Sequence, residues 1–437
     1  MVGVPLLAAS EGYVTTASSL EPLRHAPFRW LIAGRTISVF GSAVAPIALA
    51  FAVLDLTGSV TDLSLVVAAQ SVATLVFVLA GGVIADRFPR HVVIVIASIL
   101  AAVTQATAAA TVLTRAATIP LLVILAALIG VFSALAVPAT AALVPQTVPS
   151  SILQQANGIN RLGFNGALIT GSAGGGALVA LIGPGWGLAV NAATFAIAAA
   201  CFARVRVQDA HDAGGARSRF LSAMREGWTE FVSHTWLWVV SVGFMILNAA
   251  FYGAITVLGP AVADQTIGRS AWGLVLAAQT AGMALGTLIA MRLRVRRFLL
   301  VAAACMASEV LVVLSLALAP QLAVLLAAML VAGIAIGQFG IVWETTVQAH
   351  VPAKRLARVY SYVMLAWLLA LPLGQVAAGP AALAIGVELT LLCAACIVAL
   401  AVGGVIASKS VRQLEYPVRG KVTTVRPGIG ERHDPAL

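Results

Sequence analysis

Twelve long apolar runs alternate with short polar segments along most of this sequence. Each run has about the 20 residues that a helix needs to cross a membrane, where every backbone N–H and C=O group must be satisfied within the helix. The pattern therefore predicts twelve membrane-spanning helices. They are expected at residues 30–54, 62–85, 92–113, 119–143, 157–182 and 186–203, and again at 236–260, 271–291, 298–318, 321–345, 357–380 and 383–408.

A polar stretch divides these runs into two sets of six, and landmarks recur between the sets. Gly82 and Gly286 lie 204 positions apart, and Gly171 and Gly374 lie 203 apart. Six crossings return the chain to its starting side, so the two sets share one orientation, as in transporters built from parallel repeats. We predict a tail (1–27), a six-helix bundle (28–204), a linker (205–235), a second six-helix bundle (236–408) and a second tail (409–437).

The linker between the two sets is expected to form an amphipathic helix on the membrane surface. Its apolar residues recur at helical spacing with charged residues between them, which is the pattern of a helix that lies in the interface plane. These apolar residues are Phe220, Leu221, Met224, Trp228 and Phe231.

Composition agrees with a membrane protein, and the placement of charge gives its orientation. Of the 437 residues, 61% are hydrophobic and 10% are charged, against about 25% charged in a soluble domain. The net charge of +10 comes mainly from arginines on one side of the predicted spans, and Lys and Arg favour the cytoplasmic side. We therefore expect an inner-membrane protein with both termini cytoplasmic, and we expect the lipid bilayer rather than nucleic acid as its partner.

The loop after the second run carries the most specific motif. It reads Gly82-Val-Ile-Ala-Asp86-Arg87-Phe-Pro-Arg90-His, and it resembles the G-x-x-x-D-R-x-G-R-[KR] signature of the major facilitator superfamily. The resemblance extends over residues 28–408 and implies an all-α membrane fold of two six-helix repeats. It also implies a conformational switch, in which Asp86 meets the start of helix 11 near Arg358 and leaves it when the cytoplasmic side opens.

Other segments resemble the exporter branch of that superfamily, which contains the enterobactin exporter and macrolide efflux proteins. Helix 5 is similar to the exporter signature G-x-x-x-G-P-x-x-G-G through Gly171, Gly175 and Gly176, while Ala167 and Ser172 replace its first Gly and its Pro. This resemblance implies export coupled to protons.

The superfamily resemblance also implies that helices 1, 4, 7 and 10 line a central cavity. Ionisable groups at membrane depth are expensive and point to function, so the charged candidates for substrate binding or proton coupling on these helices are Arg35, Asp55 and Glu344. The resemblance places Glu309 on a peripheral helix and sets it aside. The polar and aromatic candidates are Asn248, Tyr252, Gln338 and Trp343. A central cavity lined by so few polar groups favours an amphiphilic substrate that is uncharged or cationic.

No Gly-Lys-Ser/Thr loop, His-Glu-x-x-His sequence or set of paired carboxylates occurs in the spans, so we expect neither an enzyme nor a cofactor or metal site. We predict a monomeric secondary transporter that exports a drug or an amphiphilic metabolite in exchange for protons. Two alternatives remain: a symporter that imports a small nutrient with protons, and a receptor or scaffold that does not transport.

Replacing Asp86 with Asn tests the switch that the motif implies. We expect slower transport with nearly unchanged substrate affinity, because the switch controls the rate of conformational change rather than binding. Initial transport rates across a range of substrate concentrations measure both quantities. A large loss of affinity at normal maximal rate would contradict this role.

Overall fold

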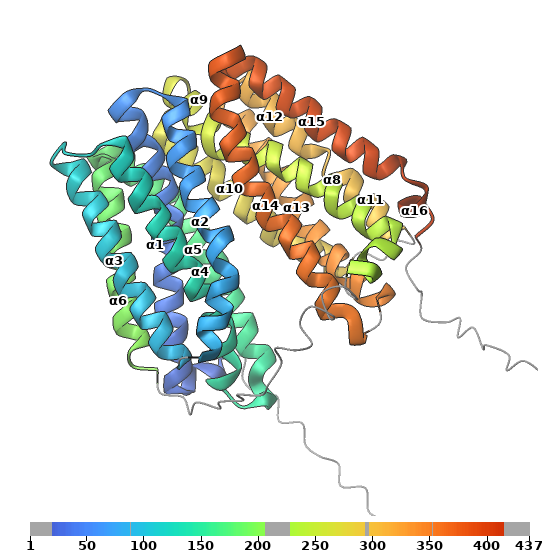
Figure 1. Ribbon diagram of the computed structural model, residues 1–437, viewed down its shortest axis with the longest axis horizontal. Helices are drawn as coiled ribbons and strands as arrows, with labels where there is room; N and C mark the ends of the chain where they lie inside the picture. The colour runs from blue at the N-terminus through green and yellow to red at the C-terminus, as the bar shows by residue number, and fades with distance from the viewer. Residues whose placement is uncertain (1–19, 88, 206–227, 293–296, 352, 415–437) are drawn as a thin grey trace, which may run out of the picture.

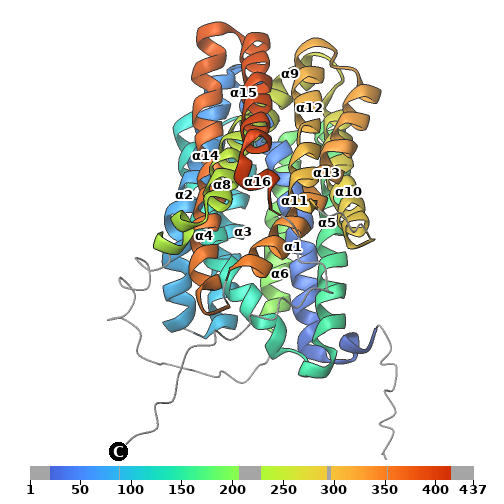
Figure 2. The same cartoon turned by 90° about the vertical axis from the view of Figure 1, so that its right-hand side faces the viewer.

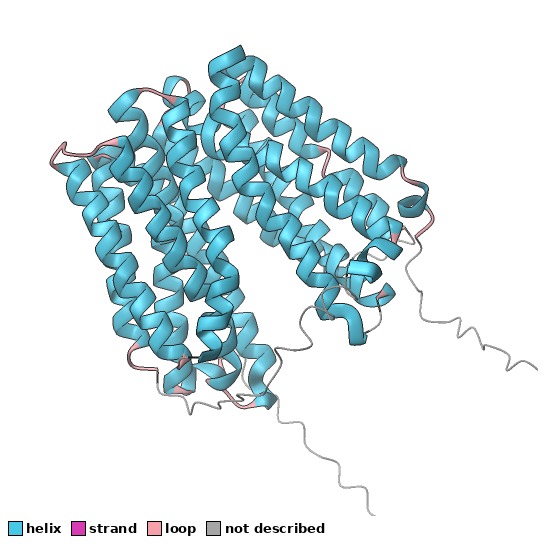
Figure 3. Ribbon diagram, viewed as in Figure 1, coloured by secondary structure: helices cyan, strands magenta, loops and turns pink. Residues whose placement is uncertain are grey.

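The computed structural model of this chain describes residues 20–87, 89–205, 228–292, 297–351 and 353–414. In these ranges the regular structure is helical (Figure 3). Twelve helical segments are long and apolar enough to cross a membrane, and they coincide with the twelve predicted runs. The all-α fold class and the twelve spans are therefore confirmed.

Each span in the first set of six is one continuous α-helix, and short 3-10 turns lie before the first span and between the fourth and fifth. The α-helices are α1 (Ala26–Thr57), α2 (Val60–Arg87), α3 (Arg90–Leu113), α4 (Ile119–Leu143), α5 (Leu153–Ile182) and α6 (Pro184–Phe202), and the turns are η1 (Glu21–Arg24), η2 (Val144–Gln146) and η3 (Ser150–Ile152).

The second set contains two interrupted spans. The seventh span joins α8 (Thr235–Gly253) to α9 (Gly259–Gln265) through η4 (Ala254–Leu258), a π-helical segment. The ninth span is broken at residues 306 and 307, between α11 (Phe298–Cys305) and α12 (Ser308–Leu318). The remaining helices are α10 (Arg269–Arg292), α13 (Leu322–His350), α14 (Ala353–Ile385), α15 (Val387–Ala407) and α16 (Lys409–Arg412).

Glycines make the short turns that reverse the chain between spans. Gly58 ends α1 with φ of 63°, and its N–H donates to the carbonyl oxygen of Leu54 at 2.8 Å. Gly183 (φ 92°) separates α5 from α6, and Gly386 (φ 84°) separates α14 from α15. Residues with a Cβ rarely adopt such φ angles, so glycine lets consecutive helices turn back within a few residues.

The two sets of six helices form two bundles that lie side by side (Figures 1 and 2). We call the end at which α1 begins and α15 finishes the terminal end, and the opposite end the distal end. In Figure 1 the bundles meet near the distal end and diverge toward the terminal end. The main contacts between the bundles are those of α5 with α10 and of α2 with α14.

Glycines allow these helices to approach closely. A Cβ added to Gly176 on α5 would lie 2.7 Å from the Cα of Gly273 on α10. A Cβ added to Gly379 on α14 would lie 2.4 Å from the Cβ of Ser64 on α2. Small residues at such crossings let backbones pack directly, as is common in membrane helices.

The described end of the linker is anchored to the second bundle. Residues 228–233 are helical, and Trp228 packs on Phe231 and Tyr362 with ring centroids 5.9 and 5.4 Å away. Glu230 pairs with Arg355. Phe220, Leu221 and Met224, which belong to the predicted amphipathic helix, lie outside the described residues.

A Gly176→Ala substitution, with Gly174→Ala as its control, tests the closeness of α5 and α10. Both changes add helix propensity, but a Cβ at Gly174 meets no atom within 4 Å. We expect Gly176→Ala to be less stable than the control by about 1–3 kcal/mol, because the backbone of α10 cannot yield cheaply. Thermal unfolding of the two purified variants measures the difference, and equal melting temperatures would contradict the packing.

Candidate functional site

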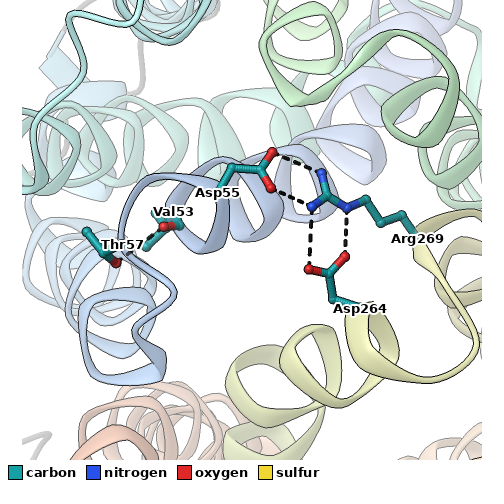
Figure 4. Close-up of polar contacts among 5 residues, drawn as sticks. All are labelled: Val53, Asp55, Thr57, Asp264 and Arg269. Carbon is teal, nitrogen blue, oxygen red and sulfur yellow. Dashed lines mark hydrogen bonds and ion pairs between the residues drawn. The ribbon is translucent and has the colours of Figure 1, made fainter.

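Arg269 links the distal ends of the two bundles. It begins α10 in the second bundle, and its guanidinium donates to both carboxylate oxygens of Asp55 on α1 in the first, with Nη1 and Oδ2 2.9 Å apart (Figure 4). Its Nε donates to Oδ1 of Asp264 on α9 at 2.8 Å. The guanidinium also lies over the ring of Phe51, 4.9 Å from the centroid. We call Arg269, Asp55 and Asp264 the Arg269 clamp.

Each main partner in the clamp stands at the unfavourable end of its own helix. Asp55 lies in the last turn of α1, where the helix dipole is negative, and Arg269 begins α10, where it is positive. Such placements cost about 0.3–1 kcal/mol each, and pairing relieves both. Gly268, with φ of 86°, makes the turn that brings Asp264 beside Arg269.

Uncharged hydrogen bonds add a second link between the bundles. Ser64 on α2 donates from Oγ to the main-chain oxygen of Gln375 on α14, and Thr61 donates to the carbonyl oxygen of Gly379 at 3.4 Å. The side chain of Gln375 in turn donates to Oγ1 of Thr256 at 3.2 Å. Since Thr256 lies in η4, this link connects the contact between the bundles to the π-helical segment of the seventh span.

A cavity of about 270 Å³ lies inside the first bundle, between α1, α3, α4, α5 and α6. Arg35 is the charged residue in its wall, and phenylalanine rings and hydroxyl groups make up much of the rest. A smaller cavity of about 110 Å³ shares Ser42, Ser133 and Phe195 with it and also reaches Gln70 and Gln105. The first bundle thus contains a polar track within an apolar shell.

Glu309 is the most deeply buried carboxyl group of the described chain. Its exposed fraction is 0%, and neither carboxylate oxygen has a hydrogen-bond partner among the described residues. It lies in the first turn of α12, directly after the break in the ninth span. Tyr252 on α8 is near enough to interact with it electrostatically. A buried acid without a described cation or hydrogen-bond donor beside it is costly when ionised, so Glu309 is a candidate for a functional role.

The structure places only part of the predicted switch. Gly82, Asp86 and Arg87 lie in the last turns of α2, and Arg358 lies near the start of α14, but these four side chains lie outside the described part of the chain. Arg90 begins α3 and is partly buried. The switch therefore remains a prediction.

The predicted cavity residues do not form one group. Arg35 lines the cavity of the first bundle, whereas Asp55 belongs to the clamp. Asn248 donates to the carbonyl oxygen of Phe244 on its own helix at 2.7 Å. Gln338 and Trp343 on α13 are both buried in the second bundle, with exposed fractions of 5% and 3%.

Tyr252 and Glu344 have different surroundings. Tyr252 is partly buried near Glu309. Glu344 has an exposed side chain on α13, and its main-chain oxygen accepts a hydrogen bond from the hydroxyl of Tyr360 at 3.3 Å. Among the described side chains, no ion pair includes Glu344.

The glycines of the helix 5 motif face two neighbours. A Cβ at Gly171 would lie 2.5 Å from the main-chain oxygen of Phe40, and one at Gly175 would lie 3.0 Å from the Cα of Val44, both on α1. Gly176 faces α10 instead. The motif thus packs α5 against its own bundle and against the other bundle at once.

Sequence reasoning missed Arg269 and Asp264 as functional residues and set Glu309 aside. Arg269 and Arg115 are the two cations of the predicted outer loops. A cation where the topology disfavours one is a signal that could have singled out Arg269. The partners themselves could not be found in this way, because Asp55 and Arg269 are 214 residues apart.

Solved structures share this fold at low sequence identity. A bacterial homolog of the human lysosomal transporter Spinster, in an inward-facing and unoccupied conformation, aligns with a TM-score of 0.69 at 16% identity, over 90% of this chain and 98% of that one. The nucleoside transporter NupG aligns with a TM-score of 0.71 at 14% identity, over 89% of this chain and 99% of that one. At these identities the likeness shows the fold.

A family match covers most of the sequence. Residues 17–417 match the MFS_3 family, described as transmembrane secretion effector. No curated protein matches the sequence. Taken with the twelve spans and the shared fold, the match shows that this chain is a transporter of the major facilitator superfamily and belongs to its transmembrane secretion effector family.

Proposed function

We propose that this protein is a secondary active transporter that exports an amphiphilic organic molecule by alternating access, in exchange for protons. The main support for alternating access is the position of the contacts between the two bundles. Within the described chain, the clamp and the other hydrogen bonds that join the bundles lie toward the distal end. The bundles diverge at the other end (Figure 1). A transporter that opens to each side in turn passes through such a state.

We assign the terminal end to the cytoplasm. Eight arginines with described side chains flank the spans there, whereas Arg115 and Arg269 lie at the distal end, and Arg269 is paired. The excess of cations at the terminal end supports this orientation. With this orientation, we propose that the conformation is inward-facing and that both termini lie inside the cell. The eight are Arg24, Arg29, Arg90, Arg204, Arg292, Arg297, Arg355 and Arg412.

Export is supported by the secretion family and by the glycines of α5, which resemble the exporter signature. When the outside opens, the cytoplasmic end has to close through other contacts. We propose that Asp86 then meets the start of α14 near Arg358, and that Glu344, exposed on α13, gains a cation partner on the first bundle.

We propose Glu309 as the group that carries the proton. It is fully buried, its carboxylate oxygens lack hydrogen-bond partners within the described chain, and Tyr252 lies near enough to interact with it electrostatically. Thr256 donates to the main-chain oxygen of Tyr252 at 2.6 Å. Its hydroxyl accepts a hydrogen bond from the side chain of Gln375, and the main-chain oxygen of Gln375 accepts one from Ser64. A change in the charge of Glu309 would therefore act electrostatically on Tyr252, and hydrogen bonds lead from Tyr252 to the contact between the bundles.

Export and its coupling are tested first with cells that do or do not make the protein, grown on chemically diverse antibiotics and dyes. The compound that shifts susceptibility most is then used in vesicles with a pH-sensitive dye. Protons that move opposite to the compound support exchange, and protons that move with it favour an importing symporter. A non-transporting receptor would shift no compound and move no protons.

Replacing Asp55 with Asn tests the clamp. We expect the outward-open population to rise roughly fivefold, since loss of such a pair removes about 1 kcal/mol. The measurement is the labelling rate of a cysteine at Ser172, buried on α5 beneath the clamp, by an impermeant maleimide in a background without native cysteines. Asp62→Asn in the first turn of α2 is the control, and equal rates in the two variants would contradict the role of the clamp.

Replacing Glu309 with Gln tests the proton carrier. We expect proton movement to cease, because the amide cannot titrate, while exchange of labelled for unlabelled compound across the membrane continues. Both are measured in the vesicles described above. Glu388→Gln on α15, where the side chain is exposed, is the matched control. Normal proton movement in Glu309→Gln would assign the coupling to another group.

A further inference from the structure

Building on the proposed transport function, we propose that the cavity around Arg35 binds an organic anion: one carboxylate or similar group on an apolar body. The proposal rests on the isolation of Arg35, the charge of the first bundle and the chemistry of the cavity wall. It also replaces the uncharged or cationic substrate expected from the sequence.

Arg35 is a cation at membrane depth, in the wall of this cavity. It lies nine residues into α1, about 13 Å from the start of the helix, and is partly buried. Its guanidinium lies 5.8 Å from the ring centroid of Phe164. Among the described side chains, no ion pair includes it. Guanidinium groups in membrane spans ordinarily find a partner, and here the open cavity is where a partner can be accommodated.

The charge of the first bundle favours an anion in that place. Residues 28–204 contain seven arginines and three acids, Asp55, Asp62 and Asp86. Asp55 is engaged by Arg269, and Asp62 lies in the first turn of α2 at the distal end. Asp86 lies near the end of α2, with its side chain outside the described part. No acid is among the described residues that line the cavity, so a cationic molecule would meet repulsion from Arg35 without compensation from them.

The remaining wall suits an apolar body with few polar groups. Ser38 and Ser42 follow Arg35 at i+3 and i+7, so they form one stripe on α1 that faces the cavity. The hydroxyls of Ser98 and Thr140 donate to carbonyl oxygens of their own helices, each at 2.7 Å, so their hydrogens are not available to a ligand. The aromatic part of the wall consists of Phe132, Phe164, Phe195 and Phe202.

A free organic anion fits this arrangement better than the uncharged or cationic molecule that the sequence suggested. That expectation rested on the small number of charged residues in the spans. It did not take into account that the charge which does line the cavity is unpaired. Among the described wall residues Arg35 is the charged one, and it decides the sign of the ligand, because a carboxylate accepts charge-assisted hydrogen bonds from a guanidinium whereas a cation is repelled by it.

The test is direct binding to the purified full-length protein in an uncharged maltoside detergent, by calorimetry. The probes form two series with matched bodies: 2-naphthoate, 2-naphthamide and 2-naphthylmethylammonium, and octanoate, octanamide and octylammonium. The variants are Arg35→Gln and Arg35→Lys. Arg29→Gln, an exposed arginine on the same helix outside the cavity, is the control. Thermal unfolding of each variant shows that it is folded.

We expect at least one anion to bind about tenfold more tightly than its amide and its ammonium partner, which corresponds to about 1.4 kcal/mol. Arg35→Gln should abolish that preference, Arg35→Lys should retain part of it, and Arg29→Gln should leave it unchanged. Absence of a preferred anion in both series would overturn the proposal, as would a preference that survives Arg35→Gln. Displacement of the bound anion by equimolar phosphatidylglycerol would assign the site to lipid phosphate and overturn the proposal that it binds a free organic anion.

This measurement needs neither a gradient nor turnover, so it separates the inference from the proposed function. Selective anion binding without export in vesicles would leave the cavity assignment standing and refute export. Export of cations by a protein that binds no anion would refute the cavity assignment alone.

Discussion

The Arg269 clamp joins the two bundles by charge, beside the crossings of small residues and the uncharged hydrogen bonds that also link them. Asp55 ends one helix and Arg269 begins another, so each opposes its own helix dipole. Separation of the bundles at the distal end therefore does more than break an ion pair. It leaves two charges that their own helices disfavour, and the closed distal end is stabilised accordingly.

Glycines at equivalent positions of the two six-helix repeats make equivalent contacts. Gly171 packs against Phe40 on α1, and Gly374, 203 positions later, packs against Ala249 on α8. Gly176 meets α10, while Gly379, again 203 positions later, meets α2. Equivalent glycines thus hold equivalent helices within each bundle and across the two bundles. The clamp breaks this equivalence, because one acid from the first bundle reaches one cation of the second.

The sequence was sufficient for the spans and insufficient for the directions in which their side chains point. The length of each run and the glycine turns mark where helices begin and end, so depth along a helix could be predicted. Rotation about the helix could not, because a span that is apolar on all sides carries no stripe to show its buried face. Gln338 and Trp343 were therefore expected in the cavity but are buried within the second bundle. The break beside Glu309 and the π-helical segment left no mark in the hydropathy.

The π-helical segment η4 has a mechanical consequence for the seventh span. A π turn contains one residue more than an α turn, and one residue of α-helix corresponds to a rotation of about 100° and a rise of 1.5 Å. If η4 tightened into an α-helix, Asp264 would rotate relative to Tyr252 by that amount without any change in the length of the chain. The seventh span thus contains one extra residue between Tyr252, which lies near Glu309, and Asp264, which pairs with Arg269. Conversion of η4 would rotate and shift one half of this helix relative to the other.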